Sequence, residues 1–211
     1  IELGAHSPLP WAQAPVPADG GCDEGPGYWD RAGGSLFDCL ELLASASGGR
    51  LAAFDEPLVR EIGLYIHIPF CRQRCHFCAF YLEIARTERI EAFCRALAQE
   101  IDLCRRQDLI KGRPLQSIYF GGGTPTAIPA ARLAGLLAMI RTAWPTNAMT
   151  EITVEAHPST VSADDLAILA EAGVTRISFG AESMNDEDFI PIGRPGTVLD
   201  TETAMTAARS A

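Results

Sequence analysis

From residue 63 onward, short apolar runs alternate with longer segments of helical periodicity. The apolar runs predict four strands, over residues 64–68, 117–120, 151–155 and 174–179. Apolar positions at helical spacing predict a helix after each strand, starting near Thr87, Pro129, Ser162 and Asp200. Repeated strand–helix units predict an α/β fold with a parallel sheet and helices outside it, either doubly wound or part of a β/α barrel.

Local signals mark the ends of these helices. Thr87 is a candidate N-cap, and Pro129 suits the first turn of its helix. Ser162 with Asp165 three residues later resembles a capping box, and Gly173 is placed to end that helix.

The first sixty residues differ from the rest. Residues 1–35 are rich in Pro, Gly and Ala and show no periodic apolar pattern, so we expect an irregular segment. Apolar residues within Ser35–Ala53 predict one short helix. We therefore expect an N-terminal extension over 1–60 and a strand–helix domain over 61–211.

Composition narrows the class of protein. Apolar residues make up 47% of the chain and charged residues 21%, as in globular proteins. The 27 acidic against 17 basic residues leave no basic surface for nucleic acid. No apolar run approaches the ~20 residues that span a bilayer, and residues 1–20 do not resemble a signal peptide. Seven cysteines, three of them within eight residues, favour a reducing cytoplasm and a metal site over disulfides.

Chemically versatile residues follow the predicted strands. Cys71 comes after the first strand, Gly121–Pro125 after the second, and Glu182 after the fourth, while Glu155 closes the third. In both candidate folds, sites form where parallel strands have their carboxyl ends. We therefore expect these residues to lie at one end of the sheet.

The strongest signal is Cys71-Arg-Gln-Arg-Cys75-His-Phe-Cys78, directly after a strand. Zinc usually takes four ligands, and here the fourth would have to be His76. His76 lies between two ligating cysteines in sequence, so its binding to the same ion would be strained. Three thiolates suit a 4Fe–4S cluster with one iron left open for a ligand. A zinc knuckle and three structural cysteines are the alternatives.

Other residues are ambiguous when taken alone. Gly121–Gly123 could form an ordinary tight loop, and a solvated surface strand would show the same alternation that puts Glu151, Thr153 and Glu155 on one face. Arg194 could be solvated, and His67 could be a satisfied core histidine. Cys94 and Cys104 fit the buried stripe of a helix.

Several motifs together carry a family resemblance. Tyr65-Ile-His-Ile-Pro-Phe-Cys71 with the cysteine triad is similar to the cluster loop of the radical S-adenosylmethionine (SAM) superfamily. More narrowly, it resembles the branch of the oxygen-independent coproporphyrinogen III oxidases. Supporting motifs follow in order over residues 63–197: Tyr119-Phe-Gly-Gly-Gly-Thr-Pro-Thr126, Glu151-Ile-Thr-Val-Glu155, Arg176-Ile-Ser-Phe-Gly180-Ala-Glu182 and Gly193-Arg194.

The resemblance implies a partial β/α barrel, of whose six strand–helix units this chain supplies about four. We therefore expect residues 61–211 to be the N-terminal part of a longer enzyme. It also implies an enzyme in which a 4Fe–4S cluster reductively cleaves SAM, so that a 5′-deoxyadenosyl radical abstracts hydrogen from a substrate. A small-molecule substrate and an electron donor such as flavodoxin or ferredoxin would be its partners, without nucleic acid or membrane.

The resemblance also assigns residues. Cys71, Cys75 and Cys78 would hold the cluster. The residues placed around SAM are Tyr65 and Phe77 beside the cofactor, Gly122, Gly123 and Thr124 at the methionine amino end, Glu155 at the ribose, Arg194 at the methionine carboxylate, and Glu182.

Two departures bear on the reaction. The oxidase pattern has a further cysteine where this chain has Phe80, and usually Gln where it has Glu182. Both point away from a true coproporphyrinogen oxidase. Methyl transfer, cyclopropanation and haem or porphyrin modification stay open, and so does a haem-trafficking chaperone that keeps the cluster.

Overall fold

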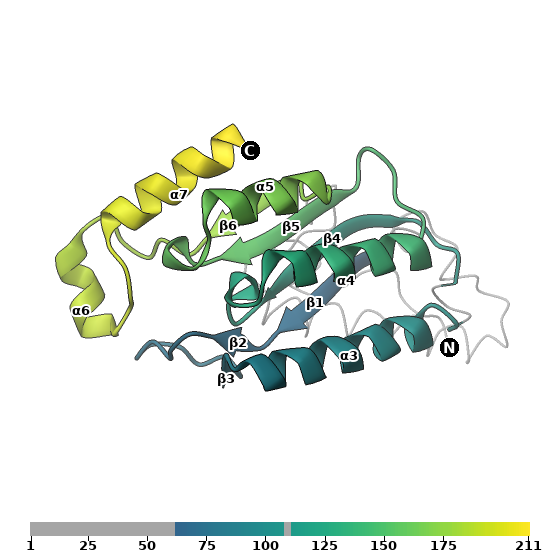
Figure 1. The fold of residues 1–211 in the computed structure, drawn as a ribbon, viewed down its shortest axis with the longest axis horizontal. Helices are drawn as coiled ribbons and strands as arrows, with labels where there is room; N and C mark the ends of the chain where they lie inside the picture. Colours follow the sequence, from purple (N-terminus) through teal and green to yellow (C-terminus); the bar gives the residue numbers. More distant parts are fainter. Residues whose placement is uncertain (1–61, 108–110) are drawn as a thin grey trace, which may run out of the picture. The chain divides into compact units, whose positions relative to one another are not determined.

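A computed structural model describes residues 62–107 and 111–211, so the expected extension over 1–60 and its short helix lie outside the described residues. The main sheet is parallel, with strand order β1, β4, β5, β6 (Figure 1). Its strands are β1 (Ile62–Ile68), β4 (Leu115–Gly122), β5 (Glu151–Ala156) and β6 (Arg176–Phe179).

Helices connect successive strands of this sheet. They are α3 (Thr87–Cys104), α4 (Ala130–Ala143) and α5 (Ala163–Glu171), followed after β6 by α6 (Phe189–Ile192) and α7 (Val198–Ser210). Each new strand adds at the same edge, so right-handed crossovers place α3, α4 and α5 on one face, as Figure 1 shows. A doubly wound sheet would reverse its strand order, and therefore the order identifies part of a β/α barrel.

The two faces of the sheet differ in chemistry. One face is apolar and belongs to the core, with the strand residues Ile66, Ile68, Ile118, Phe120, Ile152 and Val154. Helix α4 contributes Leu133, Leu137 and Ile140 to the same core. The opposite face carries polar and aromatic side chains, because Tyr65, Tyr119, Thr153 and Arg176 occupy matching positions across the four strands. The face without helices is therefore the one available for chemistry.

Most predicted boundaries agree with the structure, and some shift. Ser162 and Asp165 form the expected capping box of α5. The expected cap at Thr87 is wrong: Thr87 is the first helical residue, and Arg86, whose backbone is extended, is the N-cap. Pro129 is likewise the N-cap of α4, and not within its first turn. Strand β6 starts at Arg176, two residues later than 174–179 implies.

Within the described ranges, 62–107 and 111–211, every helix is too short or too polar to serve as a membrane span.

His157 has an unusual environment after β5. It caps a short 3₁₀ helix (Pro158–Thr160), and its Nδ1 accepts a hydrogen bond from the Ser159 amide at 3.2 Å. The ring proton must then lie on Nε2, which is buried and has no hydrogen-bond partner among the described residues. Burial, with help from Arg194 and Arg72, lowers the pKa of His157 to about 4. The folded protein therefore holds this ring neutral.

Because this pKa lies below the ordinary histidine value of 6.5, the unfolded chain takes up a proton before the folded one does as the pH falls. We expect the free energy of unfolding to fall as the pH is lowered from ~6.5 to ~4. The protonation of His157 accounts for at most ~3 kcal/mol of this decrease. Urea unfolding of the protein and of His157→Asn across that window measures it. The asparagine oxygen can still accept from Ser159, so equal pH dependence in the two proteins would contradict the assignment.

Candidate metal and cofactor site

The cysteines lie on a loop, residues 71–82, that we call the cysteine loop. Two short strands, β2 (Phe70–Cys71) and β3 (Glu83–Ile84), pair in parallel and close its base. The Glu83 amide donates to the Pro69 carbonyl at 2.6 Å, and the Ala85 amide donates to the Cys71 carbonyl at 2.8 Å. The loop therefore starts directly beyond β1, with Cys71 held by backbone hydrogen bonds.

A second loop meets it there. The glycine loop, residues 121–125, starts in the last two residues of β4, the neighbour of β1 in the sheet. The Gly123 amide donates to the Ile68 carbonyl at 2.8 Å, and the Thr124 amide to the Phe70 carbonyl at 2.7 Å. These bonds bring the Thr124 hydroxyl within 3.4 Å of the Cys71 sulfur. Two motifs that lie 53 residues apart in sequence thus form one surface.

The cysteine loop offers three thiols as a donor set. All three are partly buried and none is in a disulfide. Burial raises the pKa of Cys71, its hydrogen bond with Thr124 opposes that rise, and the nearby Cys78 and Cys75 add to it. Among the described residues, no three Cys, His, Asp or Glu side chains are grouped as ligands of a single ion. A 4Fe–4S cluster binds each thiolate at a separate iron, so a donor set of three thiolates fits it and leaves one iron open for a ligand.

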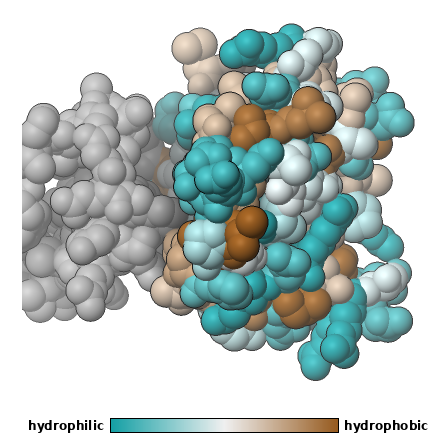
Figure 2. Space-filling model, turned by 90° about the vertical axis from the view of Figure 1, so that its left-hand side faces the viewer, coloured by the Kyte–Doolittle hydropathy of each residue, from teal (hydrophilic) through white to brown (hydrophobic). Residues whose placement is uncertain are grey.

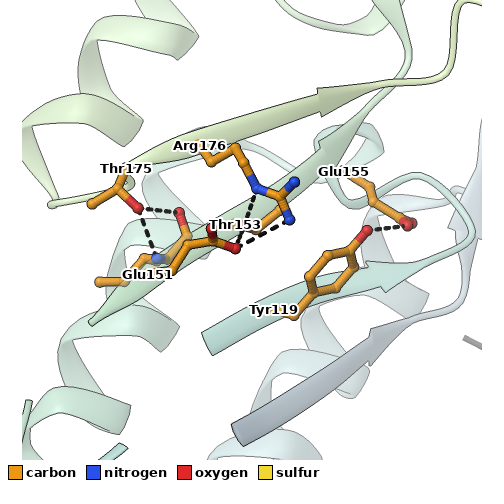
Figure 3. Close-up of polar contacts among 7 residues, drawn as sticks. Tyr119, Glu151, Thr153, Glu155, Thr175 and Arg176 are labelled. Carbon is orange, nitrogen blue, oxygen red and sulfur yellow. Dashed lines mark hydrogen bonds and ion pairs between the residues drawn. The ribbon is translucent and has the colours of Figure 1, made fainter. Parts of the chain in front are cut away.

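Glu155 lies on the helix-free face at the carboxyl end of β5, where its carboxylate is held at both oxygens. The Tyr119 hydroxyl donates to Oε1 at 2.7 Å (Figure 3). The Gly122 amide donates to Oε2 at 3.1 Å. Burial and the bond to Glu155 raise the pKa of Tyr119, so its hydroxyl stays a neutral donor. The ring of Tyr119 in turn stacks on Tyr65, with centroids 5.9 Å apart.

The backbone at Gly122 requires glycine. Its φ of 112° is unfavourable for any residue with a side chain, and a Cβ there would lie 2.7 Å from the His67 ring. This conformation turns the Gly122 amide toward Glu155. His67 itself is exposed and lies 3.3 Å from the Tyr65 hydroxyl, so it belongs to this face and not to the core.

Arg194 and Glu182 form a second part of the site, beyond β6. The Arg194 side chain is only 8% exposed and lies 3.4 Å from the Glu182 carboxylate. It also donates to the Gly180 carbonyl. Glu182 has a φ of 63°, the only positive value at a non-glycine residue in the described part of the chain. The Gly180–Glu182 turn therefore holds a strained backbone around a paired guanidinium.

The structure thus groups the residues expected from the sequence into neighbouring sets. Cys71 joins Gly123 and Thr124, Glu155 joins Gly122 and Tyr65, and Glu182 joins Arg194. Cys75, Cys78 and Phe77 lie on the cysteine loop, where Phe77 is 53% exposed. Figure 2 views this end of the molecule and shows separate hydrophobic areas among hydrophilic ones.

Sequence reasoning missed two members of the polar face. Tyr119 belongs to the motif that precedes the glycine loop, and its alternation with the buried Ile118 and Phe120 is the signal that places it opposite the core. Arg176 donates to Thr153 at 2.9 Å and pairs with Glu151 at 3.1 Å (Figure 3). Its position opposite Thr153 depends on the register of β5 and β6, which no local pattern reveals.

Comparisons with known proteins find similar sequences and a similar fold. The Heme chaperone HemW of Bacillus subtilis is 39% identical over 147 residues, which are 69% of this chain and 38% of the chaperone. The oxygen-independent coproporphyrinogen III oxidase of Cereibacter sphaeroides is 38% identical, over 64% of this chain and 29% of the oxidase. The solved structure of coproporphyrinogen III oxidase from Escherichia coli, described as a radical SAM enzyme, matches with a TM-score of 0.64 and 32% identity, over 70% of this chain and 34% of that one.

This chain therefore covers well under half of each of these relatives, although the match extends over most of its own length. The solved structure confirms the expected α/β fold with a parallel sheet, of the partial barrel type. The sequence profile of the radical SAM superfamily matches residues 65–211, and with these similarities it establishes that the chain belongs to the radical SAM superfamily.

Proposed function

We propose that this chain is the cluster- and SAM-binding part of a radical SAM enzyme that modifies a small organic molecule. The contact between the Cys71 sulfur and the Thr124 hydroxyl, at 3.4 Å, carries the proposal. This contact places the cysteine loop against the glycine loop. A ligand at the junction of the two loops can reach both an open iron of the cluster and the exposed backbone of the glycine loop. An electron donor such as flavodoxin or ferredoxin completes the system.

Each residue has a definite task in this proposal. Cys71, Cys75 and Cys78 hold the 4Fe–4S cluster, which when bound supplies the electron that cleaves SAM reductively. Gly122, Gly123 and Thr124 present backbone to the methionine amino end, which glycine permits because no side chain intervenes. Glu155 accepts from the ribose hydroxyls, and Tyr65 and Phe77 flank the cofactor.

Arg194 and Glu182 set the charge beside the methionine carboxylate. A guanidinium suits a carboxylate because its fork of donors matches the two oxygens. In this chain that guanidinium already faces Glu182 at 3.4 Å. The carboxylate of SAM therefore shares Arg194 with an internal carboxylate, while the negative charge of Glu182 favours the cationic sulfonium.

A haem-trafficking chaperone is the second candidate. The observation that favours it is the 39% identity to a Heme chaperone of Bacillus subtilis, together with Phe80 in place of a further cysteine. Haem binding by the purified protein without SAM cleavage would favour the chaperone. Release of 5′-deoxyadenosine with a reductant would favour the enzyme.

Replacing Cys71, Cys75 or Cys78 by Ala should abolish iron content and SAM cleavage, because a cluster with three protein ligands cannot lose one and stay bound. Anaerobic reconstitution followed by iron and sulfide analysis measures this. Cys94→Ala is the matched control, since Cys94 lies on α3 beside the core. Stoichiometric zinc without iron after anaerobic purification would contradict the proposal.

Glu155→Ala and Arg194→Ala should weaken SAM binding ~10- to 100-fold with iron content unchanged, because each loses a charge-assisted hydrogen bond. Tyr119→Phe should weaken it less, since Tyr119 acts through Glu155. Adding Tyr119→Phe to Glu155→Ala should then change nothing further. Glu151→Gln, at the opposite end of β5, is the control. Independent effects of Tyr119 and Glu155, or unchanged affinity in all variants, would remove these residues from the site.

The protein should cleave SAM without decarboxylating coproporphyrinogen III. That substrate carries four propionates, and Glu182 leaves less positive charge for a carboxylate than Gln would. The missing cysteine at Phe80 points the same way. Anaerobic incubation with the substrate, SAM and a reductant tests this, and protoporphyrinogen formed at enzymatic rates would overturn it.

A further inference from the structure

The cysteine loop is fastened to the segment that carries Arg194. The backbone amide of His76 donates to the Ile192 carbonyl at 2.8 Å, and the side-chain amide of Gln73 donates to the Gly193 carbonyl at 3.1 Å. The Nδ1 atom of His76 lies 3.2 Å from the Pro191 carbonyl. A carbonyl only accepts, so Nδ1 carries the proton in this bond.

One face of the His76 ring lies on Gly193. A Cβ built on Gly193 would be 2.7 Å from Nε2 of His76 and 2.8 Å from the two adjoining ring carbons. Gly193 also ends α6 in the left-handed conformation, with φ of 61°. The face of the His76 ring thus lies against Gly193 while Nδ1 is bonded to Pro191, and this close approach explains why glycine is needed there.

The residue after Gly193 is Arg194, whose side chain is 8% exposed and meets Glu182 and the Gly180 carbonyl. On the other side, His76 lies directly between Cys75 and the Phe77-Cys78 pair in sequence. His76, together with Gln73, therefore connects the loop of the three thiols to the backbone that positions the guanidinium. Rigid placement of a ligand between two groups requires such a connection.

We propose that His76 is a positioning residue that fixes Arg194 relative to the cysteine loop, so that a ligand bound at the cluster meets the guanidinium in register. The inference rests on the proposed function, because it assumes that SAM spans these two groups. His76 makes no contact with the ligand itself: it acts through the Pro191 carbonyl and the Gly193 backbone.

Three variants at position 76 separate hydrogen bonding from packing. His76→Leu keeps bulk but loses the bond to Pro191, His76→Ala loses both, and His76→Asn keeps a donor near the place of Nδ1. We expect Leu and Ala to weaken SAM binding ~3- to 10-fold, the range of one hydrogen bond, and Asn to restore most of it. Equilibrium binding of SAM to the reconstituted protein measures the affinity, and iron content is measured alongside.

Arg74→Ala is the matched control, because Arg74 lies on the same loop and donates within it, to the Phe80 carbonyl at 3.4 Å. Its SAM affinity should equal that of the unchanged protein. The perturbation of the reduced cluster's electron paramagnetic resonance signal by SAM gives a readout other than affinity. It should diminish in His76→Leu and be retained in Arg74→Ala.

Gly193→Ala tests the contact from the 191–193 segment, because it replaces no residue of the cysteine loop. The new methyl group should collide with His76 and weaken SAM binding, and His76→Ala in the same protein should relieve part of that loss. Additive losses would overturn the proposal. So would unchanged SAM affinity in His76→Leu, or loss of iron in that variant, which would assign His76 to cluster retention. An unchanged protein that binds a cluster but no SAM would defeat the proposed function instead.

Discussion

The parallel pairing of β1 with β4 is the constraint on which the site depends. It places Ile68 beside Gly122, so the chain leaves both strands at the same level. The cysteine loop and the glycine loop then begin side by side, and backbone bonds from Gly123 and Thr124 to Ile68 and Phe70 lock them together. A shift of one residue in this register would turn the side chains of one strand to the other face, so that Tyr65 and Tyr119 would no longer lie side by side.

The same pairing explains why the polar side chains gather on one face. In a parallel sheet, partners across strands point to the same side, so Tyr65, Tyr119, Thr153 and Arg176 form one row. Helices cover the opposite face, which is filled by Ile, Val and Phe. On the polar face, the Glu155 carboxylate accepts hydrogen bonds from Tyr119 and Gly122 at its two oxygens.

The sequence was informative where local chemistry is distinctive. Alternation placed Glu151, Thr153 and Glu155 on one face, and the spacing of Cys71, Cys75 and Cys78 indicated a metal loop, because both patterns are short in range. It could not reveal the bonds of His76 to the 191–193 segment, which join positions 115 residues apart. The N-cap of α3 was missed by one residue, since Arg86 caps with its backbone and no side-chain signal marks it.

The ion pair of Arg194 links the fold to selectivity. A cation that is 8% exposed would be costly to leave unpaired, so the chain must compensate it before any ligand arrives. Glu182 does this from a backbone conformation that few residues tolerate, next to the carbonyl of Gly180, which accepts from the same guanidinium. A glutamine at 182 could accept a hydrogen bond but would leave the charge uncompensated. The carboxylate thus stabilises the buried cation and weakens its attraction for other anions. In the function proposed above, a ligand with one carboxylate and a neighbouring positive charge therefore fits this pair better than a ligand with several carboxylates.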